Sequence, residues 1–183
     1  MRNNAWLSSG GDEASDEVIT PRYVVEPIVK YLKAKNFKVV WCPFDTVVSQ
    51  YVRVLYKEGF DVRFGHRDIG LDFFKYECPE ADVIVSNPPF SYKDLILERL
   101  YKLDKPFMVL FPVQALQGKK RTKLFMKYGL EYLGFDSRPC FYTKNDLLSI
   151  KTGNHFASGY YCRNVLPEKL IFEELKLIQE PFI

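Results

Sequence analysis

The sequence contains no pair of cysteines spaced as C-x-x-C, because its four cysteines lie far apart at positions 42, 78, 140 and 162. This spacing gives no support for a zinc ribbon or a thioredoxin-like redox motif. The first residues contain no apolar segment typical of a secretory leader, and no apolar run is long enough to span a membrane. We therefore expect a protein with free thiols in a reducing cytoplasm.

What the sequence does contain is enough apolar material for one core. It has 183 residues, of which 47% are hydrophobic and 16% aromatic, which is the size and composition of a single folded domain. We expect a flexible polar tail over 1–17 and one domain over 18–183, with a small substrate-facing insertion around 136–156. The net charge of +3 permits a polyanionic partner, and it is equally compatible with a neutral small substrate.

Apolar segments of two kinds alternate along the chain. Helical spacing predicts helices over about 20–36, 49–58, 92–102 and 123–128. Short apolar runs predict strands over about 37–41, 60–64, 81–86, 107–111, 132–135 and 158–163. This alternation is typical of an α/β fold whose mostly parallel sheet is covered on both faces. Ligands bind beyond the carboxyl ends of such strands, so we expect segments 42–46, 66–72 and 87–90 to share one edge.

The strongest motif follows a predicted buried strand, where segment 82–90 reads DVIVSNPPF. Two consecutive prolines cannot continue a strand, so they fix a rigid, extended loop at the ligand edge. The segment resembles the [DNS]-P-P-[YFW] motif of amino-methyltransferases, and in its N-P-P-F form it is most similar to the branch that methylates the 6-amino nitrogen of adenine. The alternative is a purely structural turn with Phe90 in the core.

The resemblance implies a role for each residue of the motif. The side-chain oxygen of Asn87 and the carbonyl of Pro88, held rigid by Pro89, would accept hydrogen bonds from the two amino protons of adenine. These hydrogen bonds would free the nitrogen lone pair for attack on a methyl sulfonium. Phe90 would offer a flat face on which an extruded base stacks.

Three other segments resemble the cofactor-binding parts of the same family. The loop Cys42, Pro43, Phe44 and Asp45 is similar to a phage-type subgroup with P-F-D-T followed by S-x-Y, although the glycines common elsewhere in the family are missing. Asp45 has two open interpretations, which are binding the amino group of the cofactor's methionine part and capping the helix that follows.

The remaining candidate cofactor residues each have an ordinary structural alternative. Thr20 and Pro21 match a cofactor-contacting loop, and they equally form an N-cap and first helical residue. By resemblance, Asp72 would accept from the cofactor's adenine amino group and Phe73 would pack on its ring. His66 is a candidate near the ribose, as is Asp68, but a lone histidine is also commonly structural.

Basic and aromatic residues late in the chain are candidates for the nucleic-acid side. Lys119, Lys120 and Arg121 form a cluster that could follow a phosphate backbone or simply be a solvated basic loop. Segment 137–142 resembles the family's target-base side, so Arg138 could hold a phosphate. Phe141 and Tyr142 could stack on a base.

Together the resemblance covers about 18–167 and implies a Rossmann-like S-adenosylmethionine-dependent methyltransferase fold. The expected sheet is seven-stranded and mostly parallel, with helices on both faces and a final antiparallel strand. The expected activity is methylation of adenine in nucleic acid, with DNA favoured over RNA, in the cytoplasm of a bacterium or phage-infected host. The resemblance implies no metal and leaves the oligomeric state open. Alternatives are RNA methylation, a degenerate fold that only binds a partner, and methylation of a protein glutamine.

Overall fold

The computed structural model describes residues 18–143, 146–151 and 157–176. Its α-helices are α2 Arg22–Val25, α3 Val29–Ala34, α4 Gln50–Lys57, α5 Lys93–Leu103 and α6 Lys119–Tyr128. Its 3-10 helices are η2 Glu26–Ile28, η3 Arg67–Ile69, η4 Phe90–Tyr92 and η5 Val113–Leu116. Its strands are β1 Val18–Ile19, β2 Val39–Cys42, β3 Asp61–Phe64, β4 Val83–Ser86, β5 Phe107–Pro112, β6 Glu131–Phe135, β7 Phe141–Thr143, β8 Asp146–Lys151, β9 Ser158–Arg163 and β10 Leu170–Glu173.

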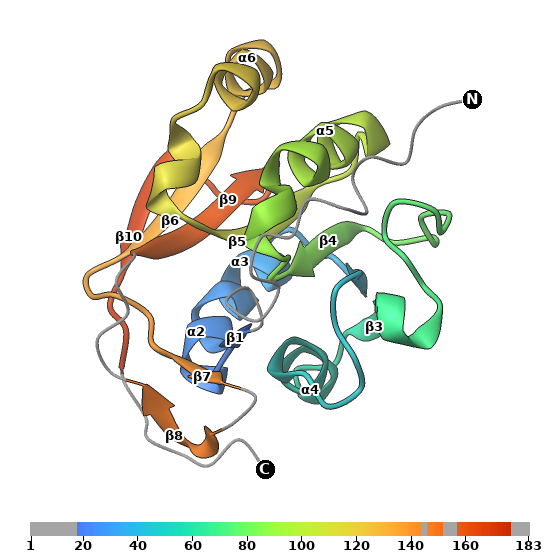
Figure 1. The fold of residues 1–183 in the computed structure, drawn as a ribbon, viewed down its shortest axis with the longest axis vertical. Helices are drawn as coiled ribbons and strands as arrows, with labels where there is room; N and C mark the ends of the chain where they lie inside the picture. Colours follow the sequence, from blue (N-terminus) through green and yellow to red (C-terminus); the bar gives the residue numbers. More distant parts are fainter. Residues whose placement is uncertain (1–17, 144–145, 152–156, 177–183) are drawn as a thin grey trace.

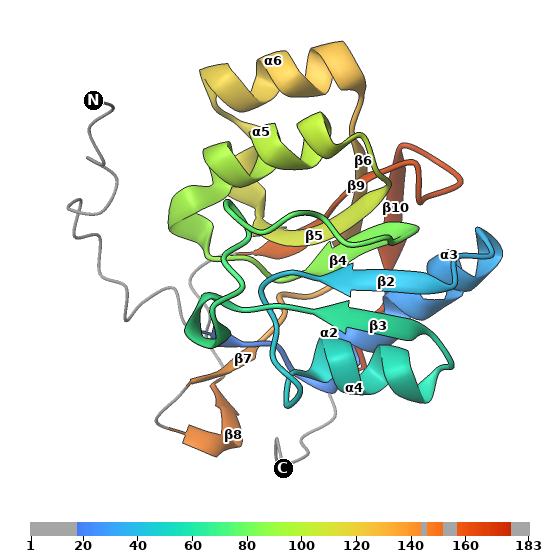
Figure 2. The same cartoon turned by 90° about the vertical axis from the view of Figure 1, so that its right-hand side faces the viewer.

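Seven strands form the central sheet in the order β10-β6-β9-β5-β4-β2-β3. Every pair of neighbours is parallel except those of β9, which runs antiparallel to both β5 and β6. Helices α5 and α6 cover one face of this sheet, and α2, α3 and α4 cover the other (Figures 1 and 2). The predicted Rossmann-like fold class, with a mostly parallel seven-stranded sheet between two helical layers, is confirmed.

The central strands are buried on both faces, which explains their unbroken apolar sequences. Alternate side chains of β4 enter different cores: Val83 and Val85 pack beneath α2 and α4, whereas Ile84 packs against α5. Neighbouring tyrosines of β9 divide in the same way, because Tyr160 joins the first core and Tyr161 the second. The sheet is thus held between two separate apolar layers.

Three parts of the chain differ from the prediction. The segment 136–156, where no strand is predicted, contains β7 and β8, which form a small antiparallel sheet with β1. The seventh strand of the central sheet is β10, which the sequence pattern does not predict. It is an edge strand with alternately exposed residues, and its three apolar residues 170–172 stand between charged ones. Helix α6 also begins four residues earlier than predicted.

The predicted tail 1–17 lies outside the described residues. Among the described residues, no helix has both the length and the apolar character needed to cross a membrane. Within the same ranges, no group of His, Cys, Asp and Glu side chains is arranged as a possible metal site.

Candidate active site

The candidate site lies where β2, β3 and β4 end. These strands are adjacent and parallel, so the loops that follow them emerge at the same edge. Backbone hydrogen bonds join two of the loops, since Gly65 donates to the carbonyl of Cys42 and Asp45 donates to the carbonyl of Gly65, both at 3.0 Å. The expectation that segments 42–46, 66–72 and 87–90 share one edge therefore holds.

Asp45 is the buried charge of this edge. Its carboxylate accepts from the hydroxyl of Ser49, which caps helix α4, and from the hydroxyl of Ser86, the last residue of β4. The side chain thus connects the loop after β2 to the residue that precedes the N-P-P-F motif. Both oxygens are occupied by hydroxyls, and Asp45 is only 8% exposed.

Among the described residues, no cation compensates this carboxylate. Burial raises the pKa of Asp45 to about 6, while the hydrogen bonds from Ser49 and Ser86 oppose that rise. Two neutral hydroxyls solvate a carboxylate far less well than water does. The arrangement is therefore suited to a positively charged partner at this position.

Asn87 supplies an acceptor that nothing in the described chain uses. Its Nδ2 donates to Thr20 Oγ1 at 3.0 Å. Its Oδ1 is buried and has no hydrogen-bond partner among the described residues. Buried polar atoms are rarely left unpaired, because each lost hydrogen bond costs about 1–3 kcal/mol. An orphan acceptor in a loop at the ligand edge is therefore a candidate contact for a donor group of a ligand.

Thr20 does not act as the predicted N-cap. The cap position of α2 is Pro21, which makes no side-chain cap hydrogen bond. The hydroxyl of Thr20 is instead directed to Asn87 and to Tyr51. The structure thus replaces the local interpretation of Thr20 with a contact across the fold.

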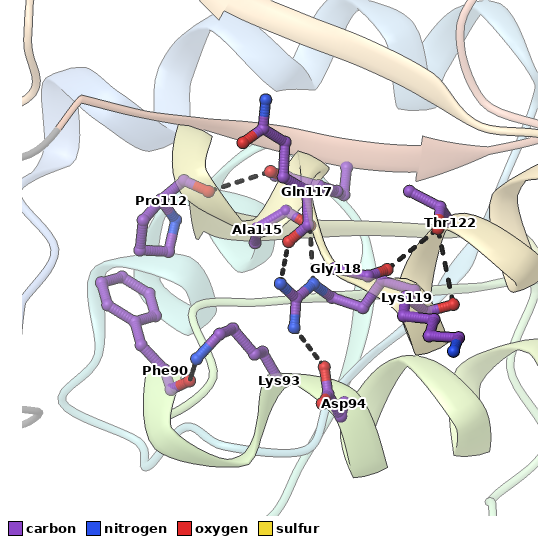
Figure 3. A network of polar contacts seen from close by, with 11 residues as sticks. Phe90, Lys93, Asp94, Pro112, Ala115, Gln117, Gly118, Lys119 and Thr122 are labelled. Atoms are coloured by element: carbon purple, nitrogen blue, oxygen red, sulfur yellow. Dashed lines mark hydrogen bonds and ion pairs between the residues drawn. The ribbon is translucent and has the colours of Figure 1, made fainter.

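The two prolines form the expected rigid corner. Pro88 is buried, and Pro89 has φ −62° and ψ 126°, an extended conformation. Phe90 is half-buried, and its ring centroid lies 6.2 Å from that of Phe111 at the end of β5. Lys93 Nζ donates to the carbonyl of Phe90 at 3.2 Å and so ties the corner to the first turn of α5 (Figure 3).

The candidate side chains after β3 and in the β2 loop differ in their exposure and in their local contacts. His66 is partly exposed, and its Nδ1 accepts from the backbone of Asp68 at 3.2 Å. Asp72 caps its own turn by accepting from the backbone of Phe74 at 2.9 Å. Phe73 is 2% exposed and packs on Phe44, with ring centroids 4.7 Å apart. This burial favours a core position for Phe73 over the predicted packing of its ring on the cofactor's adenine.

In the loop after β2, fewer side chains are exposed at the site edge than the sequence suggests. Cys42 is fully buried in the core beneath α4, and burial raises its pKa well above the usual range. Pro43 is buried as well, whereas Phe44 is partly exposed. Cys42 therefore contributes to the edge through its backbone carbonyl alone.

The three residues of the basic cluster at the start of α6 have different environments. Lys119 and Lys120 are exposed at the start of the helix. Arg121 is occupied, because it donates to the carboxylate of Asp94 on α5 and to the carbonyls of Ala115 and Gln117. Figure 3 shows these acceptors close together between α5 and the loop before α6. Arg121 therefore joins two helices, whereas Lys119 and Lys120 remain the exposed residues of the predicted phosphate-binding cluster.

The late aromatic pair is also internal. Phe141 and Tyr142 are 1% and 3% exposed and pack in the core beneath α2 and α4, so neither can stack on a base as predicted. Arg138 is exposed. The neighbouring Cys140 is fixed by Tyr23, whose hydroxyl donates to its carbonyl at 3.0 Å and accepts from its amide at 2.8 Å.

Sequence reasoning missed three residues that this site uses. Ser86 holds Asp45, and its position directly before the N-P-P-F motif was the available signal. Tyr51 and Tyr160 share a buried hydrogen bond at 2.8 Å behind Thr20. Their sequence separation of 109 residues gives no local signal.

Comparison with known proteins gives distant structural likenesses. No protein-family model matches the chain, and no curated protein sequence matches it. A dimethyladenosine transferase from Plasmodium falciparum is 13% identical with a TM-score of 0.43, over 80% of this chain and 62% of that one. A putative class I S-adenosylmethionine-dependent methyltransferase from Listeria monocytogenes is 10% identical with a TM-score of 0.47, over 94% and 70%.

A modification subunit of a putative type I restriction enzyme from Vibrio vulnificus YJ016 is 13% identical with a TM-score of 0.44. The likeness covers 93% of this chain and 49% of that one. The chain thus spans less than two thirds of the first and third of these proteins. Likenesses at this distance carry no statement about activity, which rests on the geometry of the site.

Proposed function

We propose that the protein is an S-adenosylmethionine-dependent methyltransferase that modifies the 6-amino nitrogen of adenine in a nucleic acid, DNA in preference to RNA. The observation that carries this proposal is the orphan Oδ1 of Asn87 at a proline-locked corner. A buried acceptor without a donor is matched by a substrate group that brings hydrogen atoms. An aromatic amine is such a group.

The chemistry follows from the acceptors of the corner. The 6-amino nitrogen is a poor nucleophile, because its lone pair is delocalised into the ring. Asn87 Oδ1 would accept a hydrogen bond from one amino proton and the Pro88 carbonyl from the other, which draws the nitrogen toward tetrahedral geometry. Catalysis would then depend on positioning and on fixed dipoles rather than on a general base. Phe90, half-buried and close to Asn87 in sequence, would support the face of the base.

The donor set of the neighbouring loops fits the cofactor. S-adenosylmethionine supplies an electrophilic methyl group on sulfonium and carries an ammonium group. Asp45, a buried carboxylate that accepts from two serine hydroxyls, would hold the ammonium. Thr20, Pro21, Pro43 and Phe44 would line the same part of the cofactor.

The other half of the cofactor would lie toward the loops after β3. His66 is partly exposed there, which suits a contact with the ribose. Asp72 is also partly exposed, and it would accept from the adenine amino group. Phe73 would support this region from the core rather than stack directly.

The nucleic-acid backbone would contact exposed basic side chains. Lys119, Lys120 and Arg138 are exposed, and lysine and arginine neutralise phosphates in such complexes. The small number of these candidate contacts fits loose or short sequence specificity, or a base that is already accessible in a single strand.

A second candidate function is a degenerate fold that binds a partner without turnover. The loop after β2 favours it, since Asp45, Thr46 and Val47 occupy positions where glycines would allow close approach of a ligand. Calorimetry with S-adenosylmethionine separates the two functions. Absence of binding would favour the degenerate module.

The proposed activity is tested by mass spectrometry of nucleosides from DNA and RNA of cells that express the protein. We expect 6-methyladenine to accumulate with the wild-type chain. The control is Asn87→Ala, which should lower turnover by about a thousandfold, as loss of an oriented group at a reacting centre does, while cofactor binding persists. Unchanged turnover in this variant would remove Asn87 from the mechanism.

A further inference from the structure

A buried chain of hydrogen bonds runs away from the site behind Asn87. Asn87 Nδ2 donates to Thr20 Oγ1 at 3.0 Å, and Thr20 hydrogen-bonds the hydroxyl of Tyr51. The hydroxyls of Tyr51 and Tyr160 lie 2.8 Å apart, and Tyr160 donates to the backbone carbonyl of Val24 at 3.1 Å. Thr20, Tyr51 and Tyr160 are 6%, 1% and 0% exposed, so the whole chain is enclosed.

The far end of this chain fixes its direction. A backbone carbonyl can only accept, and each hydroxyl has a single hydrogen to donate. Tyr160 donates to Val24, so it must accept from Tyr51. Tyr51 must then accept from Thr20, which in turn must accept from Asn87. The direction leaves one orientation for the amide, with its NH2 toward Thr20 and its oxygen on the other side.

The geometry points to Thr20, Tyr51 and Tyr160 as positioning residues that turn the carbonyl oxygen of Asn87, rather than its NH2, toward the substrate amine. This inference rests on the proposed function. Packing alone cannot select the orientation, because the oxygen and NH2 ends of an amide have nearly the same size. A reversed amide would present donors to an amine that is itself a donor.

The hydroxyls keep their protons under ordinary conditions. Burial raises the pKa of both Tyr51 and Tyr160 well above the usual range of tyrosine. The order of donors and acceptors is therefore constant across neutral pH, and the chain acts as a permanent support rather than as a proton switch.

Tyr160→Phe tests this inference, because it removes the hydroxyl that donates to Val24 and accepts from Tyr51. Without this hydroxyl, the Val24 carbonyl no longer fixes which way Tyr51 donates. Tyr51 can then donate to Thr20, and Thr20 can donate to a reversed Asn87. We expect kcat to fall by roughly tenfold or more, as when one oriented dipole is lost, with cofactor Kd and KM within about twofold of the wild type. If Tyr160→Phe folds poorly, Tyr51→Phe can replace it, because it interrupts the hydrogen-bond chain one residue closer to Asn87. It should show the same fall in kcat with Kd and KM nearly unchanged.

Tyr101→Phe is the matched control. Tyr101 is also a buried tyrosine, 4% exposed, and its hydroxyl also donates to a backbone carbonyl, that of Gly129 at 2.7 Å. It lies outside the chain behind Asn87, so its loss should leave kcat unchanged. Equal losses of kcat in Tyr101→Phe and Tyr160→Phe would reduce the effect to general stability and overturn the inference.

A second measurement does not depend on activity. In protein labelled with ¹⁵N-asparagine, the side-chain NH2 protons of Asn87 should show nuclear Overhauser contacts to Thr20. These contacts should weaken in Tyr160→Phe but not in Tyr101→Phe. Their absence in the wild type would overturn the inference about orientation. If they are present and the wild type methylates no adenine, the proposed function fails and the orientation stands.

Discussion

Two aspartates at opposite ends of the same pair of strands have opposite environments. Asp82 lies before β4 and accepts from the backbone amides of Lys38 and Val39, at 2.7 Å and 2.9 Å, where β2 begins. These bonds lower its pKa, and the residue is exposed. Asp45 follows β2 at the other end, is buried, and has a pKa raised to about 6 by that burial.

The difference shows that the carboxylates at the two ends of the sheet are stabilised to different degrees. The amino end is stabilised by a carboxylate that is well solvated and well bonded. Among the described residues, the carboxyl end retains a buried carboxylate without a cation and an amide oxygen without a donor. Such groups lower stability, so their presence together at a ligand edge is consistent with a function in binding.

The largest expected effect comes from Asp45→Asn, which removes the charge and keeps the shape. Cofactor affinity should fall by about 10- to 100-fold, because a hydrogen bond to a charged group contributes about 1.5–3 kcal/mol. The same variant should be more stable than the wild type by about 1–3 kcal/mol at pH 8. Calorimetric titration and denaturant unfolding measure the two effects.

The stability advantage of Asp45→Asn should depend on pH, because the Asp45 carboxylate titrates. The folded pKa of Asp45 is raised, so its stabilising contribution is present at pH below 3.8 and is lost as the pH rises through about 6. The stability advantage of Asp45→Asn should therefore vanish near pH 4 and reach its full size above pH 7. An advantage that stays constant with pH would contradict the assignment of a buried charge.

The next effect concerns the candidate base platform at the carboxyl end. Phe90→Ala should weaken binding of an adenine-containing oligonucleotide by about 1–3 kcal/mol, the usual range for one stacked base. The control is Phe172→Ala, on the edge strand β10, where the residue is 65% exposed and β10 is far along the sheet order from β4. Equal effects in fluorescence binding assays would return Phe90 to a structural role.

At the amino end, Asp82→Asn should produce the reverse of Asp45→Asn. It should lower the free energy of unfolding by about 1 kcal/mol at pH 7, because the two backbone amides would then donate to a neutral amide oxygen, a weaker acceptor than the carboxylate. The folded pKa of Asp82 is lowered, so this loss should be present above the unfolded pKa and shrink as the pH falls through the folded one. Urea unfolding at several pH values tests it, and a change in cofactor affinity would argue against a purely structural role.

The smallest effect is expected at the exposed start of α6. Lys119→Gln with Lys120→Gln should reduce the salt dependence of DNA binding, and the log–log slope should change by about 0.9 for each phosphate that is no longer neutralised. A matched pair, Lys35→Gln with Lys57→Gln, removes two exposed lysines on the face covered by α3 and α4. If both pairs change the slope equally, α6 has no special place in binding.

The sequence predicts this molecule best where the signal is local. Strands β4 and β5 are apolar runs, and the N-P-P-F corner can be located because prolines act on the adjacent backbone. The shared edge of segments 42–46, 66–72 and 87–90 follows from the parallel strands, but the individual side-chain contacts between distant segments could not be predicted. Asn87 meets Thr20 across 67 residues, and Ser86 meets Asp45 across 41. Burial of Phe73, Phe141 and Tyr142 was missed for a related reason, because an aromatic residue suits a core and a base platform equally well.

Under the proposed function, the proline pair has a consequence for the choice among bases. Proline lacks a backbone N–H, so residues 88 and 89 contribute carbonyls and no donors. Around the amide oxygen of Asn87 the corner is therefore rich in lone pairs and poor in hydrogen atoms. Guanine and thymine would bring a carbonyl oxygen to this place, where it would find no donor from either proline. Adenine instead brings an amine, whose hydrogen atoms can be donated to these acceptors. The corner would therefore favour adenine over guanine and thymine.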